Sequence, residues 1–220
     1  MKLIKFAAAA LISLSSLTAH AAYFQIVGGT SGVDVPANND YEGSLPAGQT
    51  YNVGGNLQSN FDGVLSLDFT FLGEDADYIN TFTSASVLTA VGGSIDNQLP
   101  SPFFGYFDDF NLGELLSFSF STNGFAIGNT VVNGSNTAGV GTVSFATALE
   151  TTFAGFGSFD AILFFDDTGG GPPDDDNHDD LIIGVRVLSA TTTSTVPEPS
   201  TIVLMMMGMA GLFAARRLKA

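Results

Sequence analysis

The strict alternation of apolar and polar residues constrains this chain most, because a period of two fits a β-strand and does not fit a helix. In Val64–Phe71, every second residue from Leu65 onward is leucine or phenylalanine, and the residues between them are serine, aspartate and threonine. Leu116–Ser121 repeats this alternation. Each segment predicts an antiparallel strand with one buried face and one more polar face.

Further strands are expected in segments rich in apolar and β-branched residues, which are Tyr23–Val27, Thr50–Leu57, Tyr78–Ala90, Val140–Leu149, Asp160–Phe165 and Leu181–Leu188. The dipeptides Asp62-Gly63, Asn123-Gly124 and Asn133-Gly134 favour turns between these runs, since a positive φ costs little there. No long pattern with a period of 3.6 residues interrupts them. We therefore predict an all-β chain with a single jelly-roll-like β-sandwich domain over residues 22–190.

The core of this domain must provide its stability, because the chain has no cysteine and therefore no disulfides. The chain has twenty phenylalanines, and the 18 that lie between residues 22 and 190 are available to fill that core. The absence of cysteine also excludes thiolate catalysis and cysteine-bound metals.

The charge of the chain is strongly negative, with 22 acidic and 6 basic residues. Five of the basic residues lie close to the two ends of the chain, namely Lys2, Lys5, Arg216, Arg217 and Lys219. Arg186 is thus the only lysine or arginine between residues 22 and 195. Such a domain is expected to repel nucleic acid and anionic lipid and to attract divalent cations or basic partners.

The N-terminal residues 1–21 have the pattern of a signal peptide. Lys2 and Lys5 precede the apolar stretch 6–17, and Ala19-His20-Ala21 fits the small-x-small cleavage site. We therefore expect export, with a mature chain that begins near Ala22.

The C-terminal residues 196–220 have three parts. Val196-Pro197-Glu198-Pro199-Ser200 is a stiff segment that is incompatible with a helix, because each proline fixes φ and lacks an amide donor. Residues 201–215 carry no charge and predict a short hydrophobic helix, and Arg216, Arg217 and Lys219 supply a positive end that stays in the cytoplasm. The Thr/Ser segment 191–195 is expected to be a linker between the domain and this tail.

In this order, the motif, the helix and the basic end resemble the PEP-CTERM sorting signal, a segment that also carries the label of an ice-binding-protein C-terminal domain. The resemblance implies a Gram-negative host and an exosortase partner at the inner membrane. It also implies a membrane-anchored intermediate, followed by release or transfer to the cell surface or the extracellular matrix. An ordinary C-terminal membrane anchor is the alternative.

Few residues of the domain are suited to catalysis. His178 is its only histidine, and it lies in an acidic run that favours the protonated ring. Two carboxylates at a suitable separation are all that a glycosidase needs, and the glutamates available for such a pair are Glu42, Glu74, Glu114 and Glu150. The chain has no tryptophan to stack on a sugar. We therefore do not expect an enzyme.

An acidic loop before the last predicted strand is the candidate metal site. Calcium suits it, because calcium takes six to eight oxygen ligands in flexible geometry. The candidate ligands are Asp166, Asp167, Asp174, Asp176, Asp179 and Asp180. The alternative is a solvated surface loop whose carboxylates cap local turns. His178 is interpreted as an ordering residue that binds a neighbouring carboxylate, since zinc would need further histidine or cysteine ligands.

These observations favour an exported, non-enzymatic protein of the cell surface or extracellular matrix. A carbohydrate-binding module, or a glycosidase, that acts on the extracellular polysaccharide is the alternative, and an aromatic strip on one sheet face would favour it.

Overall fold

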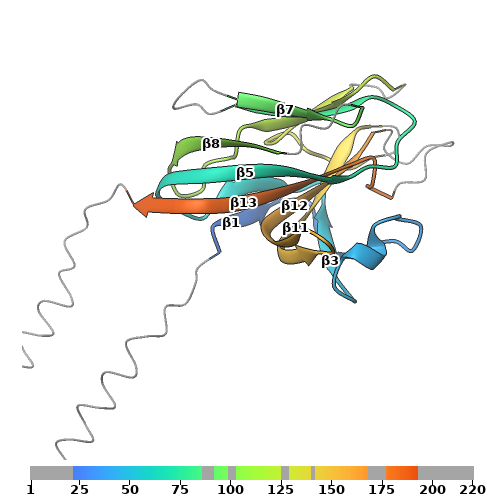
Figure 1. Cartoon of the computed structure of the whole chain (residues 1–220), viewed down its shortest axis with the longest axis horizontal. Helices are drawn as coiled ribbons and strands as arrows, with labels where there is room; N and C mark the ends of the chain where they lie inside the picture. Colours follow the sequence, from blue (N-terminus) through green and yellow to red (C-terminus); the bar gives the residue numbers. More distant parts are fainter. Residues whose placement is uncertain are drawn as a thin grey trace, which may run out of the picture.

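The structure, a computed structural model, describes residues 22–85, 92–98, 103–124, 129–139, 142–167 and 177–192. These residues form antiparallel β-sheets, joined by turns and by the short 3₁₀ turn η1 (Glu42–Ser44) (Figure 1). The all-β prediction is therefore confirmed. In this described part of the chain, no helix has the length and apolar character needed to cross a membrane.

The larger sheet has seven strands in the order β2-β3-β11-β12-β13-β5-β8. Their bounds are β2 (Thr30–Asp34), β3 (Thr50–Val53), β5 (Gly63–Gly73), β8 (Phe103–Phe110), β11 (Ser144–Phe153), β12 (Gly157–Asp166) and β13 (Leu181–Thr192). The central strands β11, β12 and β13 follow one another in the chain and pair as antiparallel neighbours. Successive strands of a jelly roll alternate between two sheets, so this part of the order differs from the jelly-roll expectation.

The smaller sheet has four strands in the order β10-β9-β6-β7, and a separate pair joins β1 to β4. The bounds of these strands are β1 (Phe24–Val27), β4 (Asn56–Ser59), β6 (Asn80–Ala85), β7 (Gly92–Asp96), β9 (Phe118–Thr122) and β10 (Thr130–Val132).

The main core lies between the two larger sheets, and phenylalanine is its most frequent residue. Phe120 of β9 stacks on Phe165 of β12, with ring centroids 4.9 Å apart and planes 6° apart. Phe82 of β6 packs on Phe69 of β5 at 5.0 Å. All four side chains are fully buried. The alternation along β5 produces this arrangement, because Leu65, Leu67 and Phe69 all face the smaller sheet.

A second apolar cluster covers the opposite face of the seven-stranded sheet. Ile162 and Phe164 of β12 point into it, while their neighbours Leu163 and Phe165 belong to the main core. The segment that carries η1 supplies the cover, through Leu45 and the half-buried Tyr41. Because β12 is buried on both faces, its sequence is a continuous apolar run rather than an alternating one.

The strands that the sequence pattern missed are β2, β7, β8 and β10. All four are edge strands of their sheets. Strands β2, β7 and β10 are short, and β8 is rich in aromatic residues without a regular alternation, so none of the four gives a clear period of two. The predicted strand Thr50–Leu57 is also divided, because Gly54 and Gly55 separate β3 from β4 and Gly54 adopts a φ of 74°.

The last strand extends two residues beyond residue 190, after which the predicted linker begins. Strand β13 continues to Thr192, where Thr191 pairs with Val64 and Thr192 pairs with Gly63 of β5. The Thr/Ser segment therefore begins as part of the sheet. The predicted signal peptide 1–21, the rest of the linker and the tail 196–220 lie outside the described residues.

Two buried asparagines join the β-layers where strand pairing is missing. Asn133 accepts a hydrogen bond from the amide of Leu57 at 2.8 Å and donates to the carbonyls of Leu57 and Leu116 at 2.6 and 2.7 Å. Asn136 forms the same kind of two-way bond with the main chain of Phe145, at 3.0 and 2.8 Å. Each side chain thus takes the place of a residue in a β-ladder.

Replacing Asn133 with Ala should lower the free energy of unfolding by about 3 kcal/mol, because the amide of Leu57 and the carbonyl of Leu116 each lose a buried hydrogen bond. Asn129→Ala is the matched control, since Asn129 is exposed. Urea unfolding followed by circular dichroism measures both variants. Equal midpoints for the two variants would show that Asn133 does not hold these layers together.

Candidate functional site

The acidic segment predicted to bind calcium lies at the end of the domain where β12 finishes and β13 begins. The structure describes Asp166, Asp167, Asp179 and Asp180, whereas Asp174 and Asp176 lie outside the described residues. Three of the four described carboxylates are almost completely buried, with 1 to 3% exposure for Asp166, Asp167 and Asp179.

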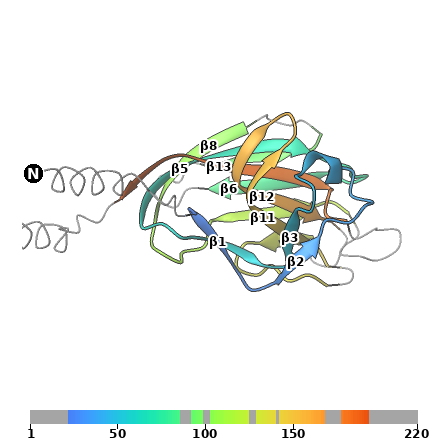
Figure 2. The same ribbon diagram turned by 90° about the horizontal axis from the view of Figure 1, so that it is seen from below.

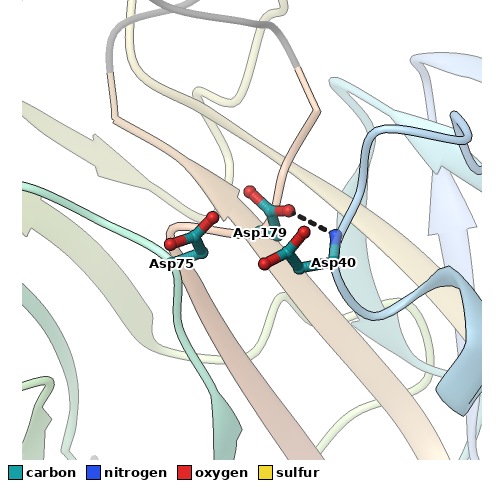
Figure 3. Close-up of side chains that lie close together, drawn as sticks. All are labelled: Asp40, Asp75 and Asp179. Carbon is teal, nitrogen blue, oxygen red and sulfur yellow. Dashed lines mark hydrogen bonds between the residues drawn. The ribbon is translucent and has the colours of Figure 1, made fainter.

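Asp179 meets two acidic residues that are distant in the sequence. Its Oδ2 accepts a hydrogen bond from the amide of Asp40 at 2.8 Å, and its carbonyl accepts one from the amide of Asp75 at 3.0 Å. The carboxylates of all three residues point toward one another (Figure 3). One oxygen from each lies within 4.8 Å of the others, a spacing that a single cation can bridge.

Neutral hydrogen bonds hold the three segments of this group together. Asn39 donates to the carbonyl of Asn177 at 2.7 Å, and Asn177 donates in return to the carbonyl of Asn38 at 3.2 Å. The hydroxyl of Tyr41 donates to the carbonyl of Glu74 at 2.9 Å and accepts from the amide of Glu74 at 2.8 Å. The positions of the three carboxylates are thus set by the fold rather than by one flexible loop.

The electrostatic effect of these acids appears at Tyr41. Burial is the largest effect on the pKa of the Tyr41 phenol and raises it above its ordinary value. The backbone hydrogen bond to Glu74 lowers this pKa by less than burial raises it, and the nearby charges of Glu74, Asp75 and Asp179 raise it further. The surroundings of Tyr41 therefore disfavour additional negative charge.

No lysine or arginine between residues 22 and 192 is available to balance the acidic group. The single candidate, Arg186, lies in the middle of β13. Its guanidinium is 3.7 Å from a carboxylate oxygen of Asp68 and 4.1 Å from the centre of the Phe159 ring, and it donates to the carbonyls of Ser158 and Phe156.

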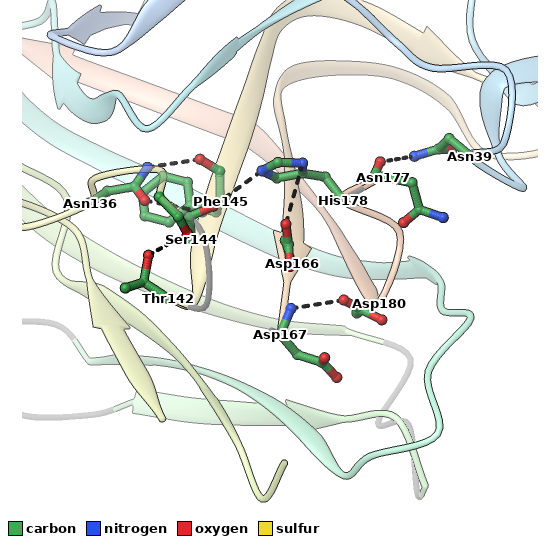
Figure 4. Close-up of polar contacts among 11 residues, drawn as sticks. Asn39, Asn136, Thr142, Ser144, Phe145, Asp166, Asp167, Asn177, His178 and Asp180 are labelled. Atoms are coloured by element: carbon green, nitrogen blue, oxygen red, sulfur yellow. Dashed lines mark hydrogen bonds and ion pairs between the residues drawn. The ribbon is translucent and has the colours of Figure 1, made fainter. Parts of the chain in front are cut away.

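His178 joins two other buried residues, as Figure 4 shows. Its Nδ1 lies 3.8 Å from Oδ2 of Asp166, and its Nε2 lies 3.2 Å from Oγ of Ser144. The 3.8 Å to Asp166 is an ion-pair distance rather than the hydrogen bond to a carboxylate that the sequence predicts for His178. A serine, a histidine and an aspartate in this order have the composition of a hydrolytic triad, but all three are at most 4% exposed. Through these contacts, His178 links Asp166 at the end of β12 to Ser144 at the start of β11. The backbone of His178 adopts a left-handed φ of 59°.

Asp167 and Asp180 form a third group. The backbone amide of Asp167 donates to Oδ2 of Asp180 at 2.8 Å (Figure 4). The side-chain amide of Asn80 donates to Oδ2 of Asp167 at 2.9 Å. Hence the four described members of the predicted calcium site do not converge on one point. The residues that sequence reasoning missed are Asp40 and Asp75, which come from the segments 38–40 and 74–77 and gave no signal beyond local acidity.

The glutamates considered for a glycosidase pair are spread over different elements. Glu42 is in η1, Glu74 follows β5, Glu114 precedes β9, and Glu150 is in β11. Among the side chains that the structure describes, Phe156 is the only exposed aromatic one. These side chains therefore do not form the exposed aromatic strip that would favour sugar binding.

The comparisons with known proteins bear on the C-terminal tail. The family model described as the PEP-CTERM protein-sorting motif matches residues 195–218. Searches of the curated proteins and of the solved structures find no match to the chain. The matched region contains Pro197-Glu198-Pro199, the apolar run that follows it, and Arg216 and Arg217. The chain therefore carries a PEP-CTERM protein-sorting motif, the mark of a protein that Gram-negative bacteria export and sort to the cell surface through an exosortase.

Proposed function

We propose that this chain is a non-enzymatic protein of the cell surface or extracellular matrix, delivered by an exosortase as a folded β-sandwich. The match of the sorting motif to residues 195–218 carries the proposal. The motif begins three residues after the last residue of β13, so the sorting signal closely follows the folded domain. In this scheme, residues 1–21 are a cleaved signal peptide, and residues 201–215 anchor an intermediate in the inner membrane. The burial of His178, Ser144 and Asp166 supports a role without catalysis, since a substrate has no direct access to these groups.

Replacing Glu198 with Ala should block processing, because the glutamate is the only charged group of the Pro-Glu-Pro motif. We expect the variant to accumulate in the membrane fraction at the mass of the uncleaved chain, in a host that carries the exosortase. Glu150→Ala is the control, since it also removes one glutamate but lies in the folded domain. If Glu198→Ala reaches the surface at the wild-type mass and rate, the tail is a simple anchor.

A carbohydrate-binding role is the second candidate. A hollow of about 370 Å³ beside η1 favours it, since Asp34 and Glu42 offer carboxylates to sugar hydroxyls and Leu45 and Pro46 offer apolar contact. Glycan-array binding by the wild type that Glu42→Gln abolishes would establish this role. Arrays without any bound glycan would instead support the first candidate.

We further propose that Asp40, Asp75 and Asp179 bind one calcium ion. The support is the convergence of three carboxylates from three separate segments, in a domain whose one arginine lies elsewhere. Carboxylates this close repel one another unless solvent or a cation intervenes. An ion bound there would link the segment before η1, the end of β5 and the start of β13.

Calcium should therefore raise the melting temperature of the purified protein by several degrees relative to chelator, because an ion that binds only the folded state adds about 2.7 kcal/mol at a hundredfold excess over its Kd. The double variant Asp40→Asn with Asp75→Asn should lose this difference. A matched control, Glu42→Gln with Asp77→Asn, changes two exposed acids outside the group and should retain it. Identical wild-type melts in millimolar calcium and in chelator would refute the site.

A further inference from the structure

The distance between the folded domain and the sorting motif is short. Only residues 193 and 194 separate the last residue of β13 from the first residue of the matched motif. Five residues lead from Thr192 to Pro197, and a fully extended chain of that length spans at most about 17 Å. A domain of this size has a radius of gyration of about 15 Å. Any enzyme that acts at the motif must therefore work beside the domain rather than at a distance from it.

The end of β13 is held in place and does not freely lengthen this connection. Residues 189–192 pair with residues 63–66 of β5. Gly63 fits closely against this end, because a Cβ built on it would lie 2.3 Å from the carbonyl oxygen of Thr191. Strand β12, in contrast, pairs with β13 only from Leu181 to Val185. The last residues of β13 thus project beyond β12 and have β5 as their neighbour.

We call the surface around this point the tail pole. It comprises the turn 60–63, residues 109–110 of β8 and residues 189–192 of β13. Asn60 binds the carbonyls of Ala22 and Tyr23, so the start of β1 also lies at this pole. The acidic group around Asp179 lies at the other end of β5 and β13, because Asp179 precedes the first residue of β13 and Asp75 follows the last residue of β5. Figures 1 and 2 show β5 and β13 running side by side along the domain.

The exposed charges of the tail pole are acidic. Asp62 is exposed in the turn, and Asp109 is exposed where β8 pairs with Val64. Anionic lipid head groups would repel these side chains, whereas a basic protein surface would attract them. A short connection and an acidic surface thus favour a protein partner with a basic face.

We propose that the tail pole is the docking surface for the membrane-bound enzyme that processes the motif, and that Asp62 and Asp109 contact a basic face of that enzyme. This inference rests on the proposed exosortase processing. It adds that the enzyme recognises the folded domain together with the tail.

The test compares processing rates of full-length variants in a host with the exosortase, from the mass of the protein after pulse labelling. Asp62→Lys with Asp109→Lys should slow processing roughly three- to tenfold, as expected when charges at the edge of an interface are reversed. The matched control reverses two exposed acids outside the tail pole, through Asp77→Lys with Glu150→Lys, and should be processed at the wild-type rate.

A second arm lengthens the connection by six Gly/Ser residues inserted after Thr192, which adds about 20 Å of reach. The enzyme then no longer has to contact the tail pole, so the effect of the two lysines should disappear. Equal rates for the tail-pole and control variants would overturn the proposal. An effect that persists with the longer connection would also overturn it, since the lysines would then act in some other way.

Glu198→Ala separates this inference from the sorting proposal. If that variant is blocked while the tail-pole variants are processed normally, sorting holds and docking is wrong. If Glu198→Ala is processed normally, the sorting proposal fails and the docking proposal fails with it.

Discussion

Contact between phenylalanines of the two larger sheets is the interaction on which the rest of the structure depends. Phe120 against Phe165 and Phe82 against Phe69 close the main core without a disulfide. Aromatic side chains suit this role because each buries a large apolar area, and tilted or offset rings add a favourable electrostatic term. The second apolar cluster then covers the outer face of the seven-stranded sheet. The segment that carries η1 packs on this cluster and brings Asp40 to Asp179. The acidic group therefore forms only once both apolar layers have formed.

The sequence predicted the central strands well and the edges poorly. The alternation in β5 and β9 and the apolar run in β12 reflect burial on one face or on both, and burial leaves a periodic signal. The edge strands β2, β7 and β10 are short, and β8 has aromatic residues without a regular alternation, so none of them showed a clear period. The end of β13 was missed for a related reason, because its last residues are partly or fully exposed.

The candidate cation site shows why local acidity is not enough to define ligands. Asp166, Asp167, Asp179 and Asp180 are close in sequence, but neighbouring residues of an extended segment point to opposite sides. Asp179 therefore faces Asp40 and Asp75, whereas Asp180 faces the amide of Asp167 and Asp166 faces His178. The partners of Asp179 lie more than 100 residues away in the chain, and only the tertiary fold reveals them.

The two ends of the domain have different roles in this account. One end holds the convergent carboxylates, and the other holds the last residues of β13, directly before the sorting motif. The central structural claim is that the sheet extends to Thr192. Amide hydrogen exchange of the full chain tests this claim most directly. We expect hydrogen-bonded amides of residues 189–192 to exchange as slowly as their partners in residues 63–66. Exchange of residues 189–192 at the rate of an unfolded peptide would show that the sheet ends earlier.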